Sequence, residues 1–140
     1  MLVIAGKNNI AVHGLELALR KFHHSDIAVV CNKNEHGVDG WQRSLRKCAQ
    51  DNGVKEITLE QAYSCASVCF LSLEFDLLVS PERFATQNIF NIHFSLLPKY
   101  KGMFTSVWPI LNADDESGVT LHYLDTVSYT HLTLPTILLV

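Results

Sequence analysis

The sequence lacks the features that mark several large classes of protein. It has no apolar run long enough for a membrane span, and its start, MLVIAGKNN, has no basic flank of the kind that signal peptides carry. No two cysteines have the CxxC spacing of a zinc or redox motif. The 11 basic and 14 acidic side chains are scattered and give a net charge of −3, which argues against non-specific nucleic-acid binding. A small substrate is favoured.

The few cysteines that are present indicate the compartment. Cys31, Cys48, Cys65 and Cys69 lie in apolar stretches such as AVVCNK and SVCFLS, which is typical of reduced, buried thiols. We therefore expect a cytoplasmic protein with no metal, no membrane association and no nucleic-acid partner. With 48% hydrophobic residues, the 140-residue chain is long enough for one hydrophobic core.

Strand patterns alternate with helix patterns along the chain. Short apolar or β-branched runs predict strands at residues 2–6, 26–31, 67–73, 88–94 and 118–124. Helices are expected at residues 9–22, at 39–53 from Asp39 to Gly53, after the capping pair Thr58 and Gln61, and at 105–112, where Pro109 interrupts the helix. Trp41, Trp108, Phe70 and Phe75 are expected in the core. The alternation predicts a three-layer α/β fold with a mainly parallel sheet.

Two polar side chains interrupt the apolar strand predicted at residues 88–94, which leads into the segment FNIHFSLLPKYKG, residues 90–102. Because side chains alternate along a strand, Asn91 and His93 share one face, and the carboxyl end of a parallel strand opens onto the crevice where α/β sheets bind ligands. An amide can stabilise an oxyanion and an imidazole can move a proton, so the pair suits acyl transfer. The alternative is a solvated strand face, or a histidine satisfied by a neighbouring backbone group.

The context of this pair carries a family resemblance. NIHFSLLPKYKG followed by GVTLHYLD resembles the signature of the folate-dependent formyltransferases, and the similarity spans residues 1–126. IAGKNNIAV and PKYKGMFTSVWPI look most like bacterial enzymes that formylate a dTDP-linked amino sugar for surface polysaccharide. The resemblance implies a Rossmann-like catalytic domain, here incomplete, that takes the formyl group from 10-formyltetrahydrofolate. It leaves open a homodimer in the full-length protein.

The resemblance also implies roles for individual residues. Asn91 would orient the formyl group and donate to the oxyanion, and His93 would stabilise that charge as an acid. The expected folate contacts are Phe75, Asp76, Leu96, Leu97 and Pro98. The expected contacts with the nucleotide-sugar are Lys7, Asn9, Lys99, Lys101 and Gly102. Each of these sets has an alternative. The turn after Gly6 can instead hold a helix cap at Asn8 or Asn9, residues 96–98 can form a turn, and the two lysines can belong to a solvated basic loop. His122, in the strand that follows, is interpreted as structural.

The chain departs from the family pattern after Thr126. The family's third catalytic residue is an aspartate four positions beyond the one matched by Asp125, where this chain has Tyr129. Residues 127–140, VSYTHLTLPTILLV, carry no Lys, Arg, Asp or Glu, and part of them resembles a translated sequencing adapter. We therefore expect a non-native tail and an inactive fragment. A fragment similar to methionyl-tRNA formyltransferase, or a non-catalytic folate-binding or structural domain, is the alternative.

Overall fold

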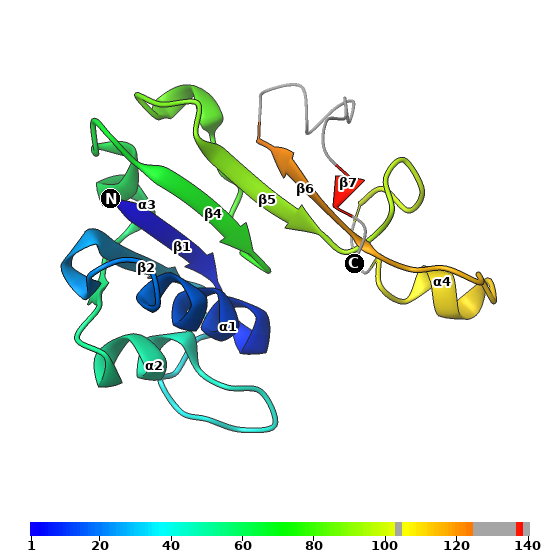
Figure 1. Cartoon of the computed structure of the whole chain (residues 1–140), viewed down its shortest axis with the longest axis horizontal. Coiled ribbons are helices and arrows are strands. Elements are labelled where there is room, and N and C mark those ends of the chain that lie inside the picture. The colour runs from blue at the N-terminus through cyan, green and yellow to red at the C-terminus, as the bar shows by residue number, and fades with distance from the viewer. Residues whose placement is uncertain (103–104, 125–136, 139–140) are drawn as a thin grey trace.

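Seven strands form one sheet in the computed structural model, which describes residues 1–102, 105–124 and 137–138 (Figure 1). The strands are β1 (Leu2–Gly6), β2 (Ile27–Cys31), β3 (Lys55–Glu56), β4 (Cys69–Leu73), β5 (Ile89–His93), β6 (Val119–Tyr123) and β7 (Ile137–Leu138). Their order is β3-β2-β1-β4-β5-β6-β7, and all pairs from β3 to β5 are parallel, whereas β6 and β7 pair antiparallel. This confirms the predicted α/β fold with a mainly parallel sheet.

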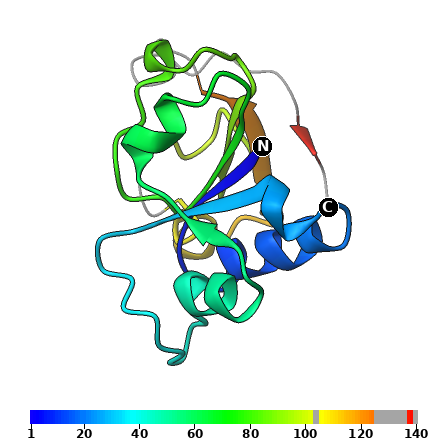
Figure 2. The same ribbon diagram turned by 90° about the vertical axis from the view of Figure 1, so that its left-hand side faces the viewer.

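Helices cover both faces of the sheet, which explains the continuous apolar strands (Figure 2). The helices are α1 (Asn8–Leu19), α2 (Leu45–Asp51), α3 (Leu59–Tyr63) and α4 (Trp108–Leu111), with 3-10 turns at His24–Asp26 and Pro81–Arg83. The neighbours Val3 and Ile4 of β1 are both fully buried, Val3 in a cluster with α3 and Ile4 in a cluster with α1 and α2. The strand therefore has no polar face.

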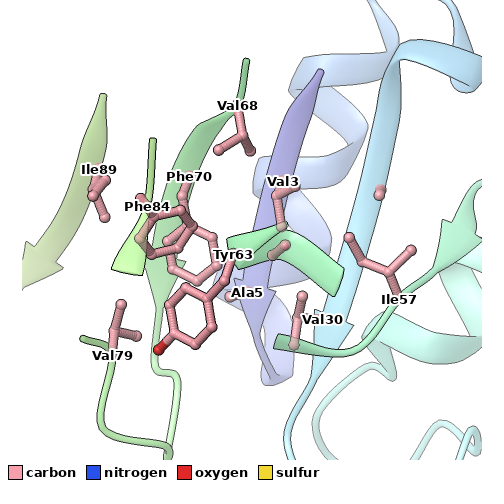
Figure 3. Close-up of a cluster of buried hydrophobic side chains, with 12 residues drawn as sticks. Val3, Ala5, Val30, Ile57, Tyr63, Val68, Phe70, Val79, Phe84 and Ile89 are labelled. Carbon is pink, nitrogen blue, oxygen red and sulfur yellow. The ribbon is translucent and has the colours of Figure 1, made fainter. Parts of the chain in front are cut away.

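An aromatic group fills the α3 side of the sheet (Figure 3). Tyr63 of α3 lies edge-on to Phe84, with ring centroids 4.7 Å apart, and Phe84 lies 5.2 Å from Phe70 of β4. The Tyr63 hydroxyl accepts a hydrogen bond from the Ser80 backbone N–H at 2.9 Å. This contact fastens the segment that follows β4 onto the core.

Two helix boundaries differ from the predictions. The helix expected over residues 39–53 begins only at Leu45, because Ser44 caps it and Asp39 instead accepts from the Ser44 backbone N–H. The buried Glu35 carboxylate accepts from the Ser44 hydroxyl and the Leu45 N–H, and so occupies the helix start. Pro109 lies in the first turn of α4 and therefore begins this helix rather than interrupting it.

The aromatic and cysteine expectations hold only in part. Phe70 is fully buried, but Trp41 is 92% exposed and Trp108 is 45% exposed, so both tryptophan predictions were wrong. All four cysteines are free thiols, although of them only Cys48 is buried and the other three are partly exposed. Burial raises the pKa of the Cys31 thiol to about 12, which leaves it protonated at neutral pH.

The end of the chain is described only at Ile137–Leu138, where β7 pairs with β6. Asp125 and Tyr129 lie outside the described residues, as do all residues of the predicted non-native tail except Ile137 and Leu138. None of the helices in the described ranges combines the length and apolar character that crossing a membrane requires.

Candidate active site

A cavity of about 430 Å³ lies where β1, β4 and β5 end. The arrowheads of these three strands point to the same edge of the sheet in Figure 1. The cavity is lined by Lys7, Asn8, Glu74, Phe75, Asn91, Ile92, His93, Phe94, Gly102, Thr105 and Ser106. Asn91 and His93 therefore open onto one space, together with residues that follow β1 and β4.

A tight turn at Gly6 shapes the wall that β1 contributes. Its φ is +152°, and a Cβ there would lie 1.7 Å from the Leu73 carbonyl oxygen, so only glycine fits. The Lys7 N–H donates to this same carbonyl at 3.3 Å. Next to the turn, Asn8 and Glu74 both have positive φ (63° and 57°), and the Asn8 amide donates to the Glu74 carboxylate at 2.8 Å. Such backbone conformations cost energy and are concentrated at functional sites.

His93 is held by the loop that follows its strand. Its Nε2 lies 2.9 Å from the Tyr100 carbonyl oxygen, and the Tyr100 side chain is itself anchored. The Tyr100 hydroxyl donates to Asp114 at 2.7 Å and accepts from the Asn112 amide at 2.9 Å. The Tyr100 hydroxyl, with Lys99 nearby, holds the pKa of the Asp114 carboxyl below its usual value.

Replacing Tyr100 with phenylalanine should raise the pKa of Asp114 toward its ordinary value. In the folded protein that pKa is lowered, so the contact stabilises the fold above the ordinary carboxyl pKa and is lost as the pH falls through the folded-state value. The variant should therefore lose less stability on acidification. NMR titration of Asp114 and urea unfolding at several pH values would measure both effects.

Tyr63 supplies the control for this substitution, because its hydroxyl accepts from the Ser80 backbone N–H. Tyr63→Phe should leave the Asp114 pKa unchanged. An unchanged Asp114 pKa in Tyr100→Phe would show that the hydroxyl does not anchor the loop through this carboxylate.

Asn91 contacts His122, for which a structural role was the expectation from sequence. Asn91 and His122 are directly opposite each other on the antiparallel strands β5 and β6, and Asn91 Nδ2 lies 3.1 Å from His122 Nε2. His122 is only 6% exposed, and its Nδ1 lies 2.8 Å from the Tyr123 carbonyl oxygen. The sequence of one strand, VTLHY, cannot reveal this contact, because it depends on the register between two strands.

The structure brings together some of the predicted ligand contacts and not others. Of these contacts, Phe75, Lys7 and Gly102 line the cavity with the catalytic pair. Leu96 and Lys99 line a separate cavity of about 450 Å³ beside Asp114.

The remaining predicted contacts lie elsewhere. Leu97 is only 3% exposed, and its N–H donates to Thr120. Asp76, Pro98 and Lys101 are all exposed. The Asn9 side chain accepts from the Arg43 backbone N–H at 2.9 Å.

The alternative reading of the first turn, a side-chain cap from Asn8 or Asn9, was wrong. Both asparagines lie inside the first turn of α1, and Lys7 occupies the cap position without a capping side-chain bond. The described ranges hold no cluster of three or more His, Cys, Asp or Glu side chains placed to bind a metal ion.

Comparison with known proteins relates the chain to the formyl transferases. The formyl transferase family model matches residues 75–128, a range that includes β5, β6 and the Asn91–His93 pair. An N-formyltransferase from Helicobacter canadensis, solved in complex with folinic acid and dTDP-3-aminofucose, is 56% identical over 89% of this chain, with a TM-score of 0.85. Residues 75–128 therefore match the formyl transferase family, and most of the chain is similar to a solved N-formyltransferase. The predicted resemblance is thereby confirmed.

Two further proteins are similar to this chain. The sugar 3N-formyl transferase WlaRD, solved in the presence of dTDP and 5-N-formyl-THF, is 53% identical over 89% of this chain, with a TM-score of 0.84. The methionyl-tRNA formyltransferase of Synechocystis sp. is 33% identical over 91 residues, or 64% of this chain. The chain spans 46% of each of the two solved relatives and 26% of the tRNA enzyme.

Proposed function

We propose that this chain is the catalytic front part of an enzyme that transfers a formyl group from 10-formyltetrahydrofolate to the amine of a nucleotide-linked amino sugar. The observation that carries the proposal is the placement of Asn91 and His93 on one cavity at the carboxyl ends of the strands. Support comes from the two solved relatives above 50% identity, whose structures hold a formylated folate with dTDP or a dTDP-sugar.

The side chains of the cavity suit this reaction. The acceptor amine attacks the formyl carbon, and the carbonyl electrons move onto oxygen to give a tetrahedral oxyanion. The attacking nitrogen gives up a proton, the folate nitrogen takes one up, and the oxyanion collapses with cleavage of the bond between the formyl carbon and the folate nitrogen. An amide proton of Asn91 stabilises the oxyanion by a hydrogen bond. The Tyr100 carbonyl accepts the Nε2 proton of His93 at 2.9 Å, which fixes the ring and leaves its Nδ1 edge for the reacting groups.

The other cavity residues divide between the two ligands. Phe75 offers an apolar surface to the folate, and Lys7 offers a positive charge to the phosphates of a nucleotide-sugar. Gly102 leaves its part of the wall open, since a Cβ there would meet nothing within 4 Å. The predicted roles of Asn9, Asp76, Lys99, Lys101 and residues 96–98 remain predictions that the cavity does not support.

We propose that the 140-residue chain binds the folate but does not transfer its formyl group. The position of the family's aspartate is Tyr129, which cannot take the proton from the attacking amine as a carboxylate would. The four free thiols are in keeping with a reducing compartment, and we place the reaction in the cytoplasm.

Calorimetric titration with 5-formyltetrahydrofolate, followed by an activity assay, tests this function. We expect the printed chain to bind the folate, and the full-length protein to formylate a dTDP-linked amino sugar. Folate binding with transfer to methionyl-tRNA instead would favour the second candidate, which the 33% identity to the tRNA enzyme supports. A folded chain that binds no folate would refute both.

A further inference from the structure

The hydrogen bonds of His93 and His122 determine where each neutral ring carries its proton. A carbonyl oxygen can only accept a hydrogen bond, so the ring nitrogen that faces it must be the protonated one. His93 directs Nε2 to the Tyr100 carbonyl at 2.9 Å, whereas His122 directs Nδ1 to the Tyr123 carbonyl at 2.8 Å. The two rings, whose centroids lie 6.5 Å apart, therefore adopt opposite tautomers.

The tautomer of His122 in turn determines the orientation of the Asn91 amide. With its proton on Nδ1, His122 presents a bare Nε2 lone pair, which can only accept. The Asn91 atom 3.1 Å away must then be the donor Nδ2, because the oxygen Oδ1 would place two acceptors against each other. One amide proton is thus committed to His122, and the second remains for the cavity that Asn91 lines.

We infer that His122 is a positioning residue, which keeps the N–H edge of the Asn91 amide in place for the developing oxyanion. An asparagine amide can turn over about its last torsion, which would exchange a donor for an acceptor at the reacting atom. The buried His122 ring is suited to prevent this, since it is 6% exposed and its own orientation is fixed by a backbone carbonyl. The hydrogen bond that His122 accepts from Asn91 also polarises the amide, which makes the second N–H of Asn91 a stronger donor.

The kinetic part of this inference rests on the proposed function, whereas its spectroscopic part does not. On the ¹⁵N-labelled printed chain, long-range ¹H–¹⁵N spectra distinguish the two tautomers. We expect neutral His122 to carry its proton on Nδ1 and neutral His93 to carry it on Nε2. A His122 ring protonated on Nε2 would overturn the inference, because it could no longer accept from Asn91.

Substitution of His122 in the full-length protein tests the consequence for turnover. His122→Phe keeps a ring but removes the acceptor, and we expect kcat to fall roughly 10- to 100-fold, with KM for the folate within about 2-fold. His122→Gln can again accept through its side-chain oxygen and should recover part of kcat. The exposed His13, whose side chain is 62% exposed, supplies the control, and His13→Gln should leave kcat unchanged.

The outcomes separate the two proposals. An unchanged kcat in His122→Phe would overturn the positioning role while leaving the formyl transfer intact. Opposite tautomers in a full-length protein without any formyl transfer would support the arrangement of Asn91 and His122 and refute the proposed function. If His122→Phe does not fold, the tautomers in the unaltered chain still decide the inference.

Discussion

Replacing His93 with alanine in the full-length protein should lower turnover by about 10²- to 10⁴-fold, the range that general acid–base groups contribute. The reason is positional: the imidazole lines the same cavity as Asn91 and is held by the Tyr100 carbonyl. Because a tetrahedral oxyanion exists only during the reaction, the ring should contribute little to binding of the ground-state folate. Steady-state kinetics and calorimetry on the same variant would measure both quantities.

The expected signature of His93→Ala is therefore a large fall in kcat with a folate dissociation constant within a few-fold of the unaltered protein. The exposed residue His13 again supplies a control, since His13→Ala should change neither quantity. Near-normal turnover in His93→Ala would remove the imidazole from its proposed role. A large loss of folate affinity would instead assign it to binding.

Replacing Gly6 with alanine should destabilise the fold by about 3 kcal/mol or more, from the strained backbone and the overpacking together. The new Cβ would lie 1.7 Å from the Leu73 carbonyl oxygen, a backbone atom that cannot swing aside as a flexible side chain does. The φ of +152° at Gly6 adds strain for any residue with a side chain. The ends of β1 and β4, which build the cavity, would have to separate.

Urea unfolding would measure this loss, with Gly40→Ala as the matched control. A Cβ at Gly40 would meet nothing within 4 Å, so that variant should lie within about 0.5 kcal/mol of the unaltered protein. Equal stability of the two variants would contradict the close approach of Gly6 to the Leu73 carbonyl of β4. A stable Gly6→Ala variant that no longer binds folate would locate the effect at the cavity rather than in the core.

The parts of the fold that sequence predicts well are those that depend on local pattern. The continuous apolar run of β1 correctly indicated burial on both faces, since Val3, Ile4 and Ala5 are all fully buried. Alternation along β5 likewise placed Asn91 and His93 on one wall. Local preference misled at Asp39, because the distant carboxylate of Glu35 supports the helix start at Ser44 instead.

The parts that sequence does not predict depend on backbone atoms and on pairing between distant segments. His93 is held by the carbonyl of Tyr100, a group that every residue type carries. His122 meets Asn91 only through the register of β5 against β6, 31 residues apart. Apolar character also cannot place Trp41, which is 92% exposed although tryptophan is ordinarily well buried.

A crystal structure of the full-length protein with 5-formyltetrahydrofolate tests the central claim most directly. We expect the formyl group in the cavity at the ends of β1, β4 and β5, with its oxygen within hydrogen-bond distance of Asn91 Nδ2 and the His93 ring. A folate bound elsewhere, or one whose formyl group faces away from both side chains, would contradict it.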